Sequence, residues 1–258
     1  MLRLFFFLTL SMVLPATAFA QERCAVLLHG LARSQTSFVL MQEALEAKGW
    51  RVVRPGYPSR QAPISELMEQ TLPKAVADCG TARVDFVTHS MGGILLRVWA
   101  GAKGNPQIGR VVMLGPPNQG SEIVEELREH PAFDWINGPA GLQLGTGEGS
   151  LPRSLPPVPF ELGVIAGDQS LNPAFSSILP GADDGKVAVY STKVIGMNDH
   201  MILPVTHTFM MNNSRVIAQT VEFLVTGQFD RTMGWMDSVL ENIGCPGGGC
   251  VGLTLDER

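Results

Sequence analysis

An excess of positive charge is missing from this sequence. Its 258 residues include 19 lysines and arginines against 24 aspartates and glutamates, which gives a formal net charge of −5 at pH 7. No run of like charges and no basic stripe that could neutralise phosphates is present. The charge pattern therefore argues against a nucleic acid as the partner.

A hydrophobic run long enough to span a membrane is also missing. The apolar stretch 4–14 follows Arg3 and is shorter than the roughly 20 residues that a spanning helix needs. Pro15 and the small-x-small sequence 18–20 come next, an order that is typical of a secretory signal peptide. We expect residues 1–20 to be cleaved and the rest to be exported to the periplasm or the medium, with a retained anchor as the weaker alternative.

Cysteine is scarce, with four residues in the whole chain. An exported chain meets an oxidising compartment, so these cysteines predict disulfide bonds, for which there are three alternative pairings. Cys24 and Cys79 each precede a buried apolar segment, and they lie near one end of the sheet if those two strands are neighbours. Cys245 and Cys250 bracket a glycine-rich loop that can close on itself. We expect these two bonds, with a zinc site as the weaker alternative.

The remaining chain, 21–258, has the length of one domain with a single large core. Short apolar segments alternate with amphipathic ones, which predicts an α/β fold with a mostly parallel central sheet flanked by helices. Pro73 should kink or restart the second helix. We expect strands at 25–28, 51–54, 84–88, 110–114, 162–166, 186–190 and 201–205, and helices at 36–48, 65–78, 94–100 and 212–225.

The interval 118–160 breaks this alternation. It is rich in glycine and proline and is too long for an ordinary connection. We interpret it as a lid or cap over a substrate pocket, with a purely structural excursion as the alternative. The tail 231–258 has little periodicity, and we expect a C-terminal extension without an assigned role.

A candidate nucleophile follows a buried segment, where 84–93 reads VDFVTHSMGG. The order of strand, serine, glycine and helix is that of a nucleophile elbow, in which a strained turn exposes the hydroxyl of Ser90. The start of the helix brings backbone donors, so the N–H of Met91 is a candidate for an oxyanion hole. Thr88 replaces the first glycine of the usual GxSxG pattern, and an ordinary turn serine is the alternative interpretation.

A second backbone donor is expected upstream, where 26–31 reads VLLHGL. The glycine lets this loop approach the reacting group, which makes the N–H of Leu31 the partner of Met91. We expect His29 to brace the loop rather than to act as a base.

These motifs resemble the α/β-hydrolase superfamily, and more narrowly its bacterial lipase-like members. The resemblance rests on the HGL oxyanion segment, the THSMGG elbow and the DGKV sequence at 184–187, and it spans most of 25–225. It implies an eight-stranded, mostly parallel sheet, a Ser–Asp–His triad in that chain order, ester substrates and no cofactor. We assign no metal-binding residue.

The resemblance also implies which residues complete the triad. Asp184 matches the acid of the DGxV segment, while Asp168, after a clearer strand, and Asp183 are the alternatives. The base is expected between the final strand and the last helix, where His207 lies. His200 precedes the strand at 201–205 and should lie at the opposite end of the sheet.

We therefore predict an exported serine hydrolase in which His207 takes the proton of Ser90, Asp184 orients the imidazole, and water releases the acyl group. The expected substrate is a small-molecule or lipid ester, and a lipid would bring transient contact with a membrane or lipid interface. The alternatives are an amidase, a thioesterase or an acyltransferase on the same fold, and a noncatalytic binding protein.

Overall fold

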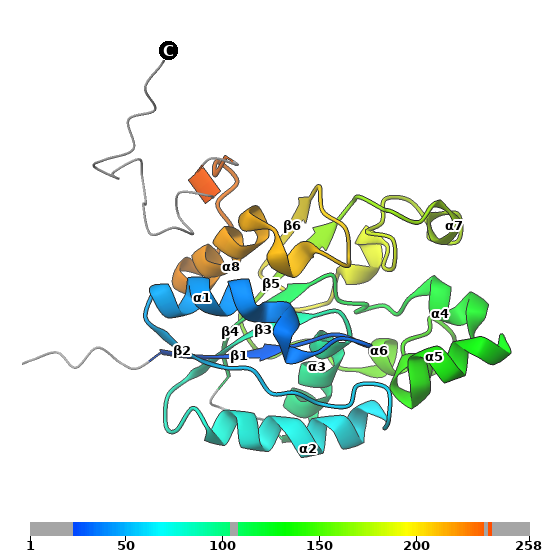
Figure 1. Ribbon diagram of the computed structural model, residues 1–258, viewed down its shortest axis with the longest axis horizontal. Helices are drawn as coiled ribbons and strands as arrows, with labels where there is room; N and C mark the ends of the chain where they lie inside the picture. Colours follow the sequence, from blue (N-terminus) through cyan, green and yellow to red (C-terminus); the bar gives the residue numbers. More distant parts are fainter. Residues whose placement is uncertain (1–22, 104–107, 235–236, 239–258) are drawn as a thin grey trace, which may run out of the picture.

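The computed structural model describes residues 23–103, 108–234 and 237–238. In this part of the chain six strands form one sheet, in the order β2-β1-β3-β4-β5-β6 (Figure 1). Each strand runs parallel to its neighbours. The strands are β1 (Arg23–Leu28), β2 (Trp50–Val53), β3 (Val84–His89), β4 (Ile108–Leu114), β5 (Leu162–Gly167) and β6 (Asp199–Leu203).

Helices cover both faces of the sheet, as predicted. On one face lie α1 (Val39–Ala47) and α8 (Ser214–Thr226), and on the other lie α2 (Ile64–Ala77) and α3 (Met91–Lys103) (Figure 1). The side chain of Asn213 caps the start of α8, and Gly227, with φ of +86°, ends it. The predicted restart at Pro73 is wrong, because α2 continues through it.

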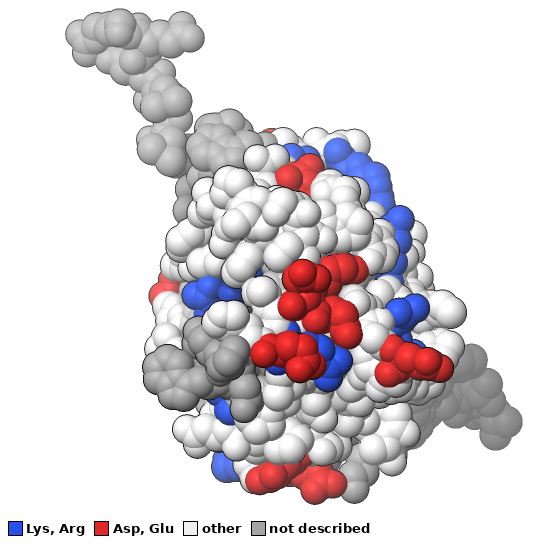
Figure 2. Space-filling model, turned by 90° about the vertical axis from the view of Figure 1, so that its right-hand side faces the viewer, with Lys and Arg blue, Asp and Glu red and all other residues white. Residues whose placement is uncertain are grey.

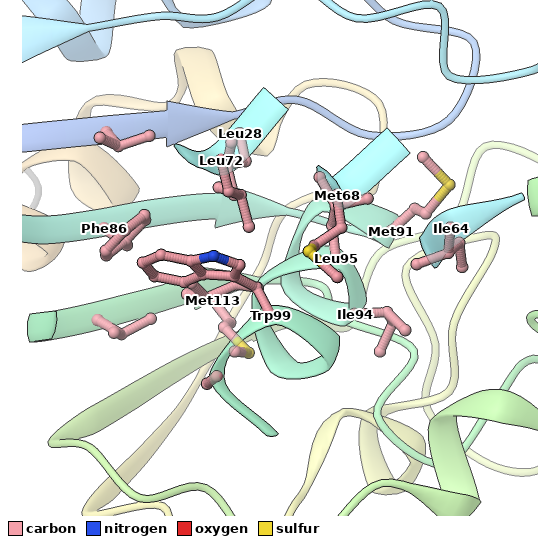
Figure 3. Close-up of a cluster of buried hydrophobic side chains, with 14 of the residues drawn as sticks. Leu28, Ile64, Met68, Leu72, Phe86, Met91, Ile94, Leu95, Trp99 and Met113 are labelled. Atoms are coloured by element: carbon pink, nitrogen blue, oxygen red, sulfur yellow. The ribbon is translucent and has the colours of Figure 1, made fainter. Parts of the chain in front are cut away.

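The two faces bury separate hydrophobic clusters. Figure 3 shows the cluster beneath α2 and α3, in which Trp99 of α3 packs against Phe86 of β3 with ring centroids 6.1 Å apart. The other cluster joins the opposite side of the strands to α1 and α8 through side chains such as Leu45 and Phe223. Near-continuous apolar strands are what a sheet covered on both faces requires.

The prediction of a strand at 186–190 is wrong, and the implied eight strands are six in the described residues. One carboxylate oxygen of Asp184 accepts hydrogen bonds from the N–H groups of Lys186 and Val187. Side-chain bonding of this kind competes with a strand ladder. The segment forms a turn, with a single bridge between Asp183 and Ala188, before the 3₁₀ helix η2 (Val189–Thr192).

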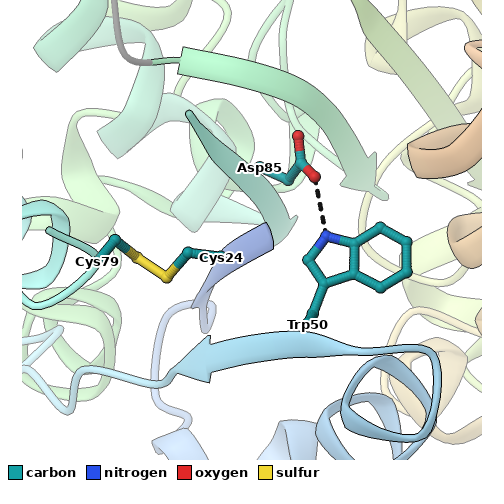
Figure 4. The surroundings of a disulfide bond; sticks show 4 residues. All are labelled: Cys24, Trp50, Cys79 and Asp85. Atoms are coloured by element: carbon teal, nitrogen blue, oxygen red, sulfur yellow. Dashed lines mark hydrogen bonds between the residues drawn. A yellow bond between two sulfur atoms is a disulfide. The ribbon is translucent and has the colours of Figure 1, made fainter. Parts of the chain in front are cut away.

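The amino-terminal edge of the sheet carries the predicted Cys24–Cys79 disulfide, with Cα atoms 5.7 Å apart (Figure 4). Beside it, Asp85 of β3 accepts hydrogen bonds from the indole of Trp50 in β2 and the N–H of Arg110 in β4. These contacts tie the strands together at this edge. The predicted Cys245–Cys250 bond and signal peptide lie outside the described residues.

The connections at the carboxyl edge contain the remaining helices. The interval 118–160 carries α4 (Glu122–Leu127), α5 (Pro131–Leu142) and α6 (Leu151–Ser154), and α5 bends at Gly138, where φ is +65°. None of the helices in the described ranges is both long and apolar enough to cross a membrane. The shorter elements are η1 (Gln35–Phe38), α7 (Pro173–Ser176) and η3 (Met210–Asn212).

Candidate active site

The candidate residues come together at the carboxyl edge of the sheet. Ser90 directly follows β3, Asp184 lies in the connection from β5 to β6, and His207 lies between β6 and α8. Because all strands are parallel, the loops that follow them share this edge, where α/β folds bind their ligands.

Ser90 occupies a sharp turn between β3 and α3. Its φ is +53°, a left-handed conformation that costs a residue with a side chain about 1–2 kcal/mol. Its N–H donates to the carbonyl of Leu114 over 2.9 Å, and its carbonyl accepts from the N–H of Gly93 over 3.0 Å. A Cβ at Gly92 would lie 2.5 Å from the carbonyl oxygen of Leu28, so this glycine lets α3 approach β1. The turn has the geometry of a nucleophile elbow.

His207 and Asp184 form a buried pair. The Nδ1 of His207 lies 2.7 Å from Oδ2 of Asp184, and the side chains are 5% and 1% exposed. The other oxygen of Asp184 is held by the N–H groups of Lys186 and Val187, and the Asp184 carbonyl accepts from the N–H of His207 over 2.9 Å. These bonds fix the carboxylate and therefore the plane of the imidazole.

The alternative residues lie elsewhere. Asp168 is exposed and accepts a hydrogen bond from the side chain of Gln169. Asp183 is buried, but its carboxylate accepts from the N–H of Gly185 and the hydroxyl of Ser176. His200 lies in β6 and hydrogen-bonds Thr192 through its Nε2. Asp184 is thus the aspartate of the three that contacts His207.

His89 packs directly against His207, with ring centroids 4.7 Å apart. Its Nε2 lies 3.0 Å from the backbone carbonyl oxygen of His207. Burial lowers the pKa of His89 well below its usual value, and the charge of His207 when protonated lowers it further. A neutral imidazole with its proton on Nε2 satisfies this contact, because a carbonyl only accepts.

The upstream loop lies close to Ser90, as an oxyanion segment requires. A Cβ at Gly30 would lie 2.8 Å from Nδ1 of His89 and 3.1 Å from Cβ of Ser90, so only a glycine fits without a shift. Met91 is the first residue of α3, and the first N–H groups of a helix have no acceptor within it. Leu31 lines the pocket described next. The two candidate donors therefore flank the serine.

His29 is held by its own loop. Its ring stacks on Tyr57 with centroids 3.9 Å apart, and its Nδ1 lies 2.9 Å from the carbonyl oxygen of Gly30. The hydroxyl of Tyr57 donates to the carbonyl of His29. Burial lowers the pKa of His29, which favours the neutral ring. These contacts hold His29 against its own loop, which agrees with the role of bracing that loop.

A cavity of about 440 Å³ opens beside Ser90 and His207, both of which line it. Side chains of α4, together with Leu144 after the end of α5, form an apolar wall, and Phe175 and Val187 continue it. The interval 118–160 thus supplies one wall of the pocket. Its apolar lining residues are Ile123, Val124, Leu127 and Leu144.

A family model described as "Alpha/beta hydrolase family" matches residues 25–229, a range that contains Ser90, Asp184 and His207. The chain belongs to the α/β hydrolase family. The sheet, its two helical layers and the strand-to-helix turn at Ser90 agree with this membership. A comparison with curated proteins gives no match.

Several solved structures share the fold of this α/β hydrolase. The mature lipase BlEst2 from Bacillus licheniformis is 17% identical with a TM-score of 0.64, over 80% of this chain and 93% of BlEst2. Phospholipase PlaB from Legionella pneumophila is 15% identical with a TM-score of 0.61, over 88% of this chain and 63% of PlaB. Esterase EaEST from Exiguobacterium antarcticum is 13% identical with a TM-score of 0.56, over 80% of this chain and 93% of EaEST. At such identities the similarity shows the fold alone.

Sequence reasoning gave no role to three residues of this α/β hydrolase that line the pocket, His89, Arg33 and Lys186. Each stands close to a residue that was assigned: His89 precedes Ser90, Arg33 follows Leu31 by two positions, and Lys186 follows Asp184 by two. That proximity was the signal available in the sequence. The contact of His89 with His207 and the proximity of Arg33 to Lys186 join segments that are distant in the sequence.

Proposed function

We propose that this α/β hydrolase is exported and cleaves carboxylic esters through an acyl-enzyme on Ser90. The observation that carries the proposal is the pairing of His207 with Asp184 at 2.7 Å in the pocket that Ser90 also lines. A serine is a weak nucleophile until a positioned base takes its proton.

The first half of the reaction forms the acyl-enzyme. His207 accepts the hydroxyl proton of Ser90 as its oxygen attacks the ester carbonyl. Asp184 holds the imidazole with its Nδ1 proton toward the carboxylate and stabilises the imidazolium that forms. The C–O bond of the ester then breaks, and the imidazolium returns the proton to the departing alcohol.

The second half consumes water. His207 takes a proton from a water molecule, whose oxygen attacks the acyl carbon, and the proton then returns to Ser90 as the carboxylic acid leaves. The N–H groups of Leu31 and Met91 stabilise both tetrahedral oxyanions. Removal of one such donor costs about 10²–10³ in kcat in hydrolases of this kind.

An apolar acyl group is the expected part of the substrate inside the pocket. The wall from α4 and Leu144 is hydrophobic, and burial of each CH₂ group contributes about 0.8 kcal/mol. The similar structures named above are a lipase, a phospholipase and an esterase, which supports an ester as the substrate. We propose that the interval 118–160 acts as a lid that shapes this site.

The test is hydrolysis of p-nitrophenyl esters from acetate to palmitate by the mature protein and by the variants Ser90→Ala, His207→Ala and Asp184→Asn. We expect each variant to lower kcat by about 10³-fold or more. Asp168→Asn is the matched control and should retain full activity. The optimum chain length separates an esterase from a lipase.

Other outcomes point to the alternatives. Turnover of amides or thioesters in preference to esters would assign another acyl transfer to the same serine. No hydrolysis of any ester, together with no labelling of Ser90 by a fluorophosphonate, would overturn the proposal in favour of a binding protein.

A further inference from the structure

Two cationic side chains line the pocket, and none of its lining residues in the described part of the chain carries a carboxylate. Arg33, half-buried, follows the upstream loop, and Lys186, exposed, follows Asp184. In the described ranges neither side chain forms an ion pair with an aspartate or glutamate. Both cations can therefore pair with an anionic group of a molecule that enters the pocket.

The two charges are close enough to repel each other. Although Lys186 is exposed as a residue, loss of water around its amino group lowers its pKa, the charge of Arg33 lowers this pKa further, and Asp184 raises it. Both cations also lower the pKa of His89. An anion between them relieves the repulsion and restores the favourable interactions of both side chains.

Outside the pocket, the face that carries α4 and α5 holds acidic side chains with basic ones among them. Acidic side chains gather near the middle of the face that carries α4 and α5 (Figure 2), and α4 contributes Glu122, Glu125 and Glu126. Glu122 accepts from the hydroxyl of Tyr190, and Glu125 accepts from the N–H groups of Thr146 and Gly147. None of these glutamates lines the pocket, so Arg33 and Lys186 do not meet them there.

The position of Lys186 indicates which part of an ester meets these charges. The proposed mechanism has the imidazolium of His207 returning a proton to the leaving alcohol, so the alcohol must face His207. Asp184 bonds that imidazole and also attracts Lys186. The alcohol side of the substrate therefore lies toward the cations, and the apolar wall remains for the acyl chain.

We infer that this enzyme prefers esters whose alcohol carries a phosphate or carboxylate, which Arg33 and Lys186 bind while the acyl chain lies against α4. The inference rests on the proposed function and names its substrate class. Hydrolysis breaks the ester C–O bond alone, and the anionic group leaves unchanged on the alcohol.

Three soluble esters with one acyl chain test the preference: 1-hexanoylglycerol, its 3-phosphate, and 3-hexanoylglycerate. Soluble probes avoid repulsion between the acidic surface and an anionic vesicle. Release of hexanoate gives kcat/KM for each. We expect the better anionic ester to exceed the neutral one by about tenfold, as a charge-assisted contact allows. The two anions distinguish a phosphate site from a carboxylate site.

The variants Arg33→Gln and Lys186→Gln locate the effect. Each should lower the ratio of kcat/KM for the anionic ester to that for the neutral ester, and the double variant should bring it near one. Added salt should lower the ratio in the wild type. Arg51→Gln, at an exposed position in β2, is the matched control and should leave the ratio unchanged.

The outcomes separate the inference from the proposed function. Hydrolysis of 1-hexanoylglycerol at least as fast as that of both anionic esters overturns the inference alone, and so does a preference that survives in the double variant. Failure to hydrolyse all three esters, with no fluorophosphonate labelling of Ser90, overturns both.

Discussion

The imidazole of His89 donates from Nε2 to the backbone carbonyl of His207 over 3.0 Å. The two residues are 118 positions apart in sequence, and both are buried. The bond fixes the main chain of His207, whereas Asp184 fixes its side chain. His89 is therefore a positioning residue, adjacent in sequence to the candidate nucleophile.

Replacement of His89 by Phe should lower kcat about tenfold with little change in KM, because a displaced base loses its alignment. The unpaired carbonyl should also lower the free energy of unfolding by about 1–3 kcal/mol. His89→Gln keeps a hydrogen-bond donor, so it should lose less of kcat and less of the free energy of unfolding than His89→Phe. The control His200→Phe removes a partly buried histidine outside the pocket and should affect stability alone. If His200→Phe lowered kcat as much as His89→Phe does, His89 would not be a positioning residue.

The stability of the protein should fall as the pH drops below 6.5. The folded pKa values of His29 and His89 are lowered from 6.5 by burial, so the unfolded chain binds more protons in acid. The stabilisation is present above pH 6.5 and is lost at up to about 1.4 kcal/mol per pH unit for each histidine. Urea unfolding at several pH values below and above 6.5 measures how steeply the free energy of unfolding depends on pH. His89→Gln should make the dependence of the free energy of unfolding on pH shallower, and an unchanged dependence in this variant would contradict the role given to His89.

Gly115→Ala should lower kcat by about tenfold or more. The φ of Gly115 is +52°, and an added Cβ would lie 2.9 Å from Oδ2 of Asp184 and 3.1 Å from Nδ1 of His207. The methyl group therefore disturbs the pair as well as the backbone. Gly49 also has a positive φ, of +88°, but no atom lies near its added Cβ, so Gly49→Ala should reduce stability and leave kcat intact. Full activity in Gly115→Ala would contradict the proposed role of the pair.

The backbone strain at Ser90 should appear as a difference in the free energy of unfolding between two inactive variants, Ser90→Gly and Ser90→Ala. Ser90→Gly should be more stable than Ser90→Ala by about 1 kcal/mol, because glycine adopts a positive φ at no steric cost. At Ser65, an exposed helical position, the order should reverse because alanine favours the helix. Thermal or urea unfolding of the four variants measures both differences. Equal stability of the two Ser90 variants is the contrary result.

Loss of the Cys24–Cys79 disulfide should lower the free energy of unfolding by about 2–4 kcal/mol, since the bond closes a long loop. The double variant Cys24→Ala/Cys79→Ala tests this more specifically than a reductant, which would also act on other cysteines. The bond lies at the edge of the sheet opposite Ser90, so we expect kcat to remain within about twofold at a temperature where the variant is folded.

Much of the fold could be predicted because its signals are local. Apolar segments such as 84–88 and the amphipathic 212–225 follow the periods of strand and helix, and the structure places β3 and α8 there. The turn at Ser90 was also readable, since its strand, glycine and helix are contiguous. The prediction of a strand at 186–190 is wrong because it rests on apolar composition. The N–H groups of Lys186 and Val187 instead bond the side chain of Asp184, which holds this segment in a turn.

The arrangement of the site was less accessible. Asp168, Asp183 and Asp184 all follow or approach apolar segments, and local chemistry does not rank them. The choice of Asp184 came from a family resemblance, and its contact with His207 is a tertiary fact. The bond between His89 and His207 joins the end of β3 to the loop after β6, and these two strands are not neighbours in the sheet. No pattern within either segment therefore predicts the bond.

The apolar wall that α4 and Leu144 build beside Ser90 contributes no group to the proposed proton transfers. Substitutions along 118–160 can thus change the width and depth of the acyl site while Ser90, His207 and Asp184 keep their geometry. A chain organised in this way can acquire a new acyl preference by small steps, each of which leaves a working enzyme. In directed evolution, this interval is where a library should be placed to alter selectivity at the least risk to turnover.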